Sequence, residues 1–202
     1  QGLDVMLLFD SVTRFARAQR EIGLAVGEPP ATRGYPPSVF DSMPKLLERC
    51  GTSDRGTITG FYTILVDGDD MDEPIADTVR GILDGHMVLS RRLAERYHYP
   101  AIDVLSSVSR LGPVVAGPVT KKAGGYIRRL MATYAEAEDL IDVGAYKPGS
   151  NPAIDEAIAK KSAIDNFLIQ AVEERTSIKE TLQAMGNLAN MQIPDEELGQ
   201  YS

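Results

Sequence analysis

Short blocks of apolar residues separated by polar turns fill the first half of the chain, and each block predicts one element. The run DVMLLFD (4–10) sets five apolar residues between two aspartates, a pattern typical of a buried strand. A helix is expected over 11–26, because Phe15 and Ile22 recur on one helical stripe and Ser11 can cap the first turn. The first predicted unit is therefore a strand that leads directly into a helix.

The next blocks are a loop, a helix and a strand. Four prolines and two glycines in GEPPATRGYPPS (27–38) predict a rigid loop. A helix is expected over 39–51, and Pro44 is a candidate restart within it. The segment GTITGFYTILVDG (56–68) is rich in β-branched and aromatic residues, which predicts a second strand ending at the acidic loop 67–72.

The alternation of helix and strand continues to about residue 110. A short helix is expected to open at Pro74 and close at Gly85. Strands are expected over 86–90 and 101–110, with a helix over 91–98 between them. Alternating strands and helices predict an α/β fold with a mostly parallel sheet covered by helices.

Beyond this point the pattern changes to helices alone, expected over 119–143, 152–171 and 177–191. The basic residues change as well, because Arg dominates before the change and Lys after it. We therefore predict two domains: an α/β core over 1–115 and an all-α helical domain over 116–202.

Composition limits the classes of partner. The chain has 202 residues, of which 43% are apolar, enough to bury a substantial core. The net charge of −8 argues against a nucleic-acid partner, because phosphates require clustered Lys and Arg. Cys50 is the single cysteine, so neither an internal disulfide nor a structural zinc site is expected. No apolar run approaches the about 18 residues of a membrane span and no signal peptide is recognisable, so we expect a cytoplasmic protein.

Asp10 is the first residue with candidate chemistry. Ligands of parallel α/β sheets bind at the carboxyl ends of the strands, so a carboxylate that closes a buried strand lies where a ligand or its metal ion would bind. In phosphate-handling enzymes this position holds the Walker-B aspartate, which binds Mg²⁺ directly or through water. Alternatively, Asp10 only complements the dipole of the following helix. Likewise, the acidic residues of 69–73 form either a metal loop or a solvated turn.

Longer stretches carry a family resemblance. DSVTRFARAQREIGLAVGEPPATRGYPPSVF (10–40), GDDMDEPIADTVRGILDGHMVLSR (68–91), HYPAIDVLSSVSR (98–110) and EDLIDVGAYKPGSNPAIDEAI (138–158) together closely resemble the ATPases of flagellar and type III protein export. These ATPases are relatives of the catalytic subunits of rotary ATP synthases. The resemblance covers nearly the whole chain in the right order. The stretch ATYAEAEDLIDVGAY favours the flagellar type over the virulence type.

The resemblance implies a RecA-like core, a C-terminal helical domain, and a homohexameric ring that binds ATP and Mg²⁺ at each subunit interface. Asp10 matches the family's Walker-B aspartate and is therefore the implied metal ligand, with Arg14 one helical turn behind it. Arg110 matches the arginine that reaches into the neighbouring subunit's site, where a guanidinium stabilises charge on the γ-phosphoryl oxygens. Without the resemblance, Arg110 would be assigned to a surface ion pair.

The resemblance also assigns residues to the adenine base. Tyr99 matches an aromatic residue that packs on the adenine ring, although a core position is the alternative for any single tyrosine. Rotary relatives complete this pocket with aromatic residues from the helical domain. This chain has Val172 and Ile178 at those places, so we expect a looser and more aliphatic contact with the base. Independently of the resemblance, we expect His86 and His98 to be structural residues at strand ends, because no second ligand or nucleophile lies near them in the sequence.

Two catalytic features of the family are missing from the sequence. No G-x-x-x-x-G-K-[ST] motif occurs, so the loop that holds the phosphates is absent, and the family's catalytic glutamate also precedes the Walker-B strand. The chain starts with Gln1 rather than an initiator Met. We therefore expect a C-terminal fragment that is inactive alone and that leaves strand edges exposed.

For the intact protein, the resemblance implies ATP hydrolysis coupled to unfolding of export substrates and their release from chaperones. The implied partners are further copies of the chain, stalk and regulator proteins of the export apparatus, and chaperone–substrate complexes. The implied location is cytoplasmic and peripheral, at the inner face of the cell membrane. A virulence-type export ATPase, a non-catalytic nucleotide-binding subunit of a rotary ATPase, and a binding module remain as alternatives. Asp10 and the proline-rich loop argue against the non-catalytic subunit.

Overall fold

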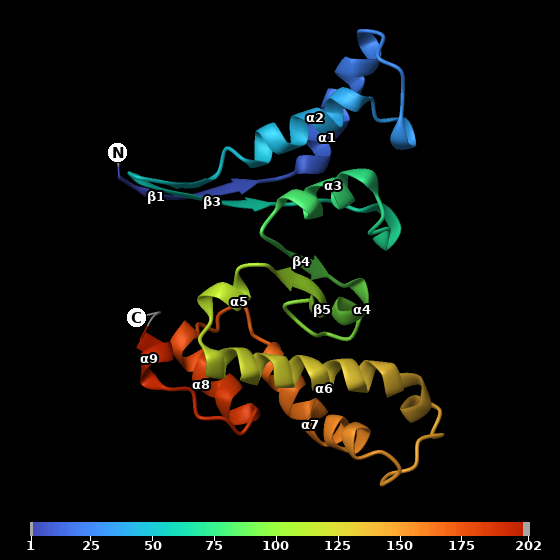
Figure 1. Ribbon diagram of the computed structural model, residues 1–202. Helices are drawn as coiled ribbons and strands as arrows, with labels where there is room; N and C mark the ends of the chain where they lie inside the picture. The colour runs from blue at the N-terminus through green and yellow to red at the C-terminus, as the bar shows by residue number, and fades with distance from the viewer. Residues whose placement is uncertain (1, 200–202) are drawn as a thin grey trace. The chain divides into compact units, whose positions relative to one another are not determined.

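The computed structural model describes residues 2–199 and divides after Leu83 into two compact units, which are described separately (Figure 1). The chain segment that connects helix α3 to strand β4 contains this division. The division after Leu83 separates two compact units and does not test the predicted domain boundary near residue 115. That boundary stays a prediction.

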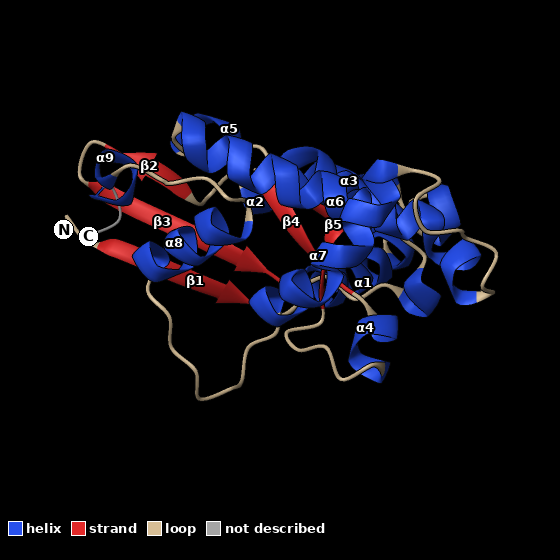
Figure 2. Ribbon diagram, turned by 90° about the horizontal axis from the view of Figure 1, so that it is seen from below, coloured by secondary structure: helices blue, strands red, loops and turns tan. Residues whose placement is uncertain are grey.

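The first unit is a small mixed sheet with helices. Its elements are β1 (Asp4–Phe9), α1 (Val12–Ala25), the 3₁₀ turn η1 (Thr32–Gly34), α2 (Pro37–Leu47), β2 (Gly51–Ser53), β3 (Gly56–Tyr62), the 3₁₀ turn η2 (Asp67–Asp69) and α3 (Pro74–Ile82). Figure 2 shows the strands side by side, with β3 between β2 and β1. β1 and β3 are parallel and in register from Asp4 opposite Thr57 to Phe9 opposite Tyr62. β2 and β3 form an antiparallel hairpin.

The core of this unit lies among its helices. Helices α1, α2 and α3 supply most of its buried apolar residues, which are Val12, Ala16, Val39, Met43, Leu47, Ile75 and Val79. Phe9 and Tyr62 pack against them from the strand ends. Ser11 accepts a hydrogen bond from the Arg14 N–H, which confirms the predicted cap of α1. Pro44 lies inside α2 without interrupting it, so the suggested restart there is wrong.

Strand β1 differs from its prediction as a buried strand. Four of its apolar side chains are exposed, Met6 and Leu8 by 66% and 74% and Val5 and Leu7 by less. Among the described residues, β1 is the edge of its sheet, so its apolar residues have a strand partner on one side only. The prediction of a strand is confirmed, and the prediction of its burial is not.

The second unit is mostly helical. Its elements are β4 (Gly85–Leu89), α4 (Arg91–Glu95), β5 (Ile102–Ser109), α5 (Gly112–Val115), α6 (Pro118–Asp142), α7 (Pro152–Leu168), α8 (Ile178–Leu188) and α9 (Asp195–Leu198). Helix α6 packs along α7 and α8 (Figure 1), and its buried residues Ile127 and Leu130 meet Ala157 and Ile164 of α7. No helix among the described residues has both the length and the apolar character to cross a membrane.

Strands β4 and β5 are antiparallel, whereas a mostly parallel sheet was predicted. The connection between them contains α4, a helix of only five residues, which is shorter than the crossover helices that join parallel strands. The short elements β2, α5 and α9 were not predicted, because segments of three or four residues are too brief to show a period.

A buried carboxylate caps the longest helix. Glu197 of α9 is 7% exposed and accepts hydrogen bonds from the Val119 N–H at 3.0 Å, the Thr120 N–H at 2.9 Å and the Thr120 hydroxyl at 2.7 Å. These donors belong to the first turn of α6, where backbone N–H groups lack intrahelical partners. Burial acts to raise the pKa of Glu197, but the hydrogen bonds from Thr120 and Val119 outweigh it and lower that pKa. Gly117 leaves room for the carboxylate, since a Cβ there would lie 2.2 Å from Glu197 Cδ.

We predict that Glu197→Gln lowers the thermal unfolding midpoint by several degrees at pH 7. A carboxyl whose pKa is lowered by folding stabilises above its unfolded pKa of about 4.3, and this stabilisation is lost as the pH falls through the folded pKa. The difference between wild type and variant should therefore narrow below about pH 4. Glu196→Gln, at an exposed position of the same helix, is the matched control. Equal midpoints for Glu197→Gln and wild type at pH 7 would contradict this assignment.

Candidate functional site

Asp10 lies where the sequence predicted it, directly after β1 and before α1. Its side chain is exposed, and its Oδ1 accepts a hydrogen bond from the Thr63 hydroxyl at 2.6 Å. Thr63 is fixed in turn by its backbone, because its N–H donates to Phe9 O and its carbonyl accepts from the Val12 N–H, both at 3.0 Å. Because β1 and β3 are parallel, the Thr63 hydroxyl and the Asp10 carboxylate lie side by side at the carboxyl ends of the two strands.

This pair can supply one oxygen ligand to a metal ion. Among the described residues, no group of three or more His, Cys, Asp or Glu side chains could hold a metal by itself. Mg²⁺ suits such a position, since it commonly takes one or two protein carboxylates and completes its shell with water and phosphate oxygens. Arg14 is exposed on α1, one turn after Asp10.

A cluster of charged residues that sequence reasoning missed lies in the same unit. A pocket of about 370 Å³ is lined by Arg17, Arg20, Arg33, Tyr35, Asp67, Asp70 and Glu73. Arg17 pairs with Asp67 at 3.4 Å, and Arg33 pairs with Asp70 at 2.5 Å. The guanidinium of Arg20 lies 5.2 Å from the centre of the Tyr35 ring. These contacts join the proline-rich loop to the acidic loop.

The arginine of the Arg33–Asp70 pair has an unusual backbone conformation. Arg33 adopts a φ of 47°, in the left-handed region that non-glycine residues seldom occupy. The hydrogen bond from Arg33, followed by that from the Asp72 N–H, lowers the pKa of Asp70. Asp67 and Asp70 each form an ion pair with an arginine at the protein surface. Exposed ion pairs of this kind agree with a solvated turn. The side chain of Asp69 lies outside the described residues.

In the second unit, Arg110 directly follows β5. Its backbone N–H donates to Asp84 O at 2.8 Å, and the neighbouring pair Gly85–Ser109 continues this ladder. The residue is exposed. The end of the strand therefore holds the backbone of Arg110 in place.

Tyr99 follows α4 and is half-exposed, with 50% of its surface open to solvent. Its carbonyl accepts a hydrogen bond from the Gln170 N–H at 2.8 Å, which ties it to the segment after α7. This segment carries Val172, 96% exposed, and Ile178, 55% exposed at the first turn of α8. The structure thus brings Tyr99 to the start of the predicted base-binding segment, and the roles of all three residues stay predictions.

Helix α4, which precedes Tyr99, is anchored by a carboxylate of α6. Glu138 accepts from Arg92 at 2.6 Å and from Arg96 at 3.1 Å. Burial acts to raise the pKa of Glu138, but the hydrogen bonds from Arg96 and Arg92 lower it. The two arginines are one helical turn apart, so a single carboxylate fixes both ends of this short helix.

A second tyrosine, Tyr97, was also missed by sequence reasoning. Its ring centre lies 6.4 Å from that of Tyr99, and the two planes meet at 85°. The motif YHYP in the sequence was a signal for this pair, because two aromatic residues two positions apart flank one turn.

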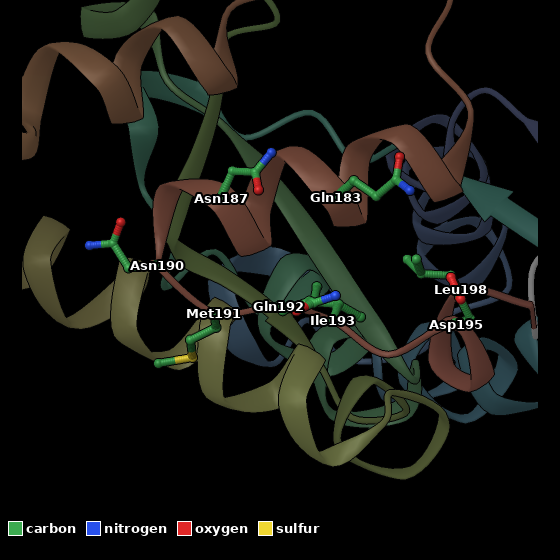
Figure 3. A pocket seen from close by; sticks show the side chains of 8 residues that line it. All are labelled: Gln183, Asn187, Asn190, Met191, Gln192, Ile193, Asp195 and Leu198. Atoms are coloured by element: carbon green, nitrogen blue, oxygen red, sulfur yellow. The ribbon is translucent and has the colours of Figure 1, made fainter.

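A larger pocket, in the second unit, has different chemistry (Figure 3). About 600 Å³ in volume, it is lined by Gln183, Asn187, Asn190, Met191, Gln192, Ile193, Asp195 and Leu198. Amides, one carboxylate and apolar groups surround it, and its lining offers no cation for a phosphate. The predicted site residues lie elsewhere.

Comparisons with known proteins match the chain in two successive segments. A family model described as "ATP synthase alpha/beta family, nucleotide-binding domain" matches residues 1–109, and one described as "T3SS EscN ATPase C-terminal domain" matches residues 117–187. The "Flagellum-specific ATP synthase" of Treponema pallidum is 57% identical over 98% of this chain and 44% of its own length. The "Type 3 secretion system ATPase" of Sinorhizobium fredii is 54% identical over 94% of this chain and 42% of its own length.

Solved structures agree. The assembled ATPase EscN from the type III secretion system of enteropathogenic E. coli has a TM-score of 0.88 and 45% identity, covering 92% of this chain and 45% of that one. EscN in complex with its central stalk EscO has a TM-score of 0.82 at 45% identity, with 92% and 44% coverage. The chain therefore spans less than half the length of the curated relatives it matches.

We predict that Arg33→Ala raises the pKa of Asp70 toward the ordinary range of an exposed aspartate, because the hydrogen bond that stabilises the carboxylate is removed. Carboxyl NMR titration of the wild type and the variant measures this pKa directly. Arg55→Ala is the control, since Arg55 pairs with Asp54 at 3.8 Å and both side chains are exposed. An Asp70 that titrates identically in Arg33→Ala and wild type would show that the pair does not form in solution.

Proposed function

Because this chain belongs to the ATP synthase alpha/beta family and continues into the C-terminal domain of type III secretion ATPases, we propose that it is part of an ATPase that energises flagellar protein export. The observation that carries this proposal is the succession of the two family matches along one chain. Family membership confirms the resemblance inferred from the sequence. It also confirms the fold class, an α/β part followed by a helical C-terminal part.

The proposed metal ligand is Asp10, which would hold Mg²⁺ together with the phosphates of ATP. When bound, Mg²⁺ neutralises charge on the phosphate oxygens. Thr63 would orient the carboxylate through its 2.6 Å hydrogen bond, as outer-shell partners of metal ligands commonly do. Arg14 adds positive charge one helical turn away.

Arg110 is proposed to act on the ATP of a neighbouring copy. Arg110 is an exposed residue at a strand end whose backbone is fixed by Asp84, a position from which an arginine side chain could reach a neighbouring subunit. There it would stabilise the charge that develops on the γ-phosphoryl oxygens. This role requires an assembly, and we propose a homohexameric ring. The relative EscN has been solved as an assembled ATPase, which supports this arrangement.

The base of ATP is proposed to stack on Tyr99, with Val172 and Ile178 as aliphatic neighbours. A half-exposed aromatic ring and two exposed aliphatic side chains are consistent with a site that is covered only when ligand binds. The sequence holds no phosphate-binding loop, so this chain by itself is proposed to hydrolyse no ATP.

The proposed partners follow the relatives. EscN binds a central stalk, EscO, and we propose stalk and regulator proteins and chaperone–substrate complexes as partners of the intact protein. Its proposed location is the cytoplasmic face of the cell membrane, as a peripheral protein. A virulence-type export ATPase is the second candidate, because a relative named "Type 3 secretion system ATPase" is 54% identical, close to the 57% of the flagellum-specific one.

In the full-length protein, Arg110→Ala is expected to reduce ATP turnover by about three orders of magnitude, because an arginine of this kind contributes at least that much in related phosphoryl-transfer enzymes. Nucleotide binding by monomers should persist, and wild-type turnover per subunit should rise with protein concentration. Steady-state hydrolysis and equilibrium binding separate the two effects. Arg49→Ala, at an exposed position, is the control. Full activity of Arg110→Ala, or turnover independent of concentration, would refute the interfacial role.

Thr63→Val is expected to weaken Mg²⁺-dependent nucleotide binding about tenfold in the full-length protein, since loss of an outer-shell hydrogen bond commonly costs one to two orders of magnitude. Titration with Mg²⁺ at fixed ATP measures the change. Thr57→Val is a matched control, because the Thr57 hydroxyl donates to Asp4 at 2.7 Å across the same strand pair, at the end opposite to Asp10. If both variants behave alike, Thr63 has no special link to the metal.

A further inference from the structure

Tyr97 lies two residues after the end of helix α4 and adopts a backbone conformation that glycine usually occupies. Its φ is 58°, its N–H donates to Ala94 O, and the following His98 N–H donates to Leu93 O, each at 3.0 Å. This pattern is a Schellman motif with Tyr97 at the left-handed position. A side chain there brings Cβ close to the carbonyl oxygen, so glycine is preferred.

A second helix in the same unit is followed by a left-handed residue of a type that tolerates this conformation. Asn190 follows α8 with a φ of 54°, its N–H donates to Asn187 O at 3.1 Å, and the Met191 N–H donates to Gly186 O at 2.8 Å. Asparagine tolerates this conformation better than other non-glycine residues. The protein therefore uses a tolerated residue at one left-handed position and a bulky aromatic residue at the other.

Burial does not explain the aromatic residue. Tyr97 is 86% exposed, so its ring contributes little to the core. Its ring contact is the edge-to-face arrangement with Tyr99, at a centroid distance that favours such pairs. A strained residue that persists without a packing reason is typical of functional sites.

We propose that Tyr97 is a positioning residue for a planar purine base, holding the ring of Tyr99 at the angle at which the base stacks. This inference rests on the proposed function, because it takes Tyr99 as the base platform. Two constraints hold that platform: the Gln170 N–H fixes the Tyr99 carbonyl, and the Tyr97 ring fixes the Tyr99 ring. The left-handed helix end is what turns the Tyr97 ring toward its neighbour.

The test compares ligands with and without a base, using the full-length protein. Dissociation constants are measured for ATP and for inorganic tripolyphosphate. Tyr97→Gly should weaken ATP binding about three- to tenfold, in line with the worth of an aromatic pair, and leave tripolyphosphate binding unchanged. Tyr97→Phe keeps the ring and should bind ATP like the wild type.

Two controls separate the ring from the backbone. Asn190→Gly relieves the same left-handed conformation at the other helix end and should leave ATP binding unchanged. Tyr97→Gly should not lower the thermal unfolding midpoint, because glycine fits the left-handed position. A weaker affinity for ATP in a protein of undiminished stability therefore reports on the ring.

The remaining outcomes distinguish this inference from the proposed function. If Tyr99→Ala weakens ATP binding but Tyr97→Gly does not, the positioning role is refuted and the base site stands. If neither variant changes ATP binding, the assignment of Tyr99 to the base is itself wrong. If Tyr97→Gly weakens tripolyphosphate and ATP equally, the residue acts on the general fold, which also refutes the inference.

Discussion

Parallel pairing of β1 with β3 is the constraint on which the first unit depends. The register sets Phe9 opposite Tyr62, so the next residues, Asp10 and Thr63, leave the sheet together and form a hydrogen bond. A slip of one residue would move each side chain of β1 to the other face of the sheet. Asp10 would then lose its hydroxyl partner. The geometry of the candidate metal ligand is therefore a property of the strand pair.

Carboxylates organise the second unit in a comparable way. Glu138 of α6 pairs with Arg92 in α4 and with Arg96 directly after it, and Glu197 joins the end of the chain's described part to the first turn of the same helix. Each satisfies several donors at once, which offsets the cost of removing a charge from water. Helix α6 thus receives two long-range polar contacts, one near each end, and the contact through Glu138 ties it to α4, the helix that precedes the aromatic pair.

The sequence predicted the features that depend on neighbouring residues. The cap at Ser11, the helices of the C-terminal part and the position of Asp10 at a strand end all follow from local patterns. It did not predict contacts between distant residues, such as Glu197 with Thr120, because no local pattern records which elements meet. The exposure of β1 was missed for a related reason, since an apolar run shows the tendency to be buried and not the presence of a partner. The left-handed Tyr97 contradicts residue preference outright, so only the structure could reveal it.

Gly117 and Glu197 are separated by eighty positions in sequence, yet the Glu197 carboxylate occupies the space that a side chain at position 117 would need. Any β-carbon at position 117 would overlap the carboxylate, whatever its chemical nature. A larger residue at position 117 therefore requires a change at position 197 as well. In an alignment of homologues, larger residues at the first position should accompany shorter side chains at the second, a covariation that arises from steric exclusion rather than from attraction.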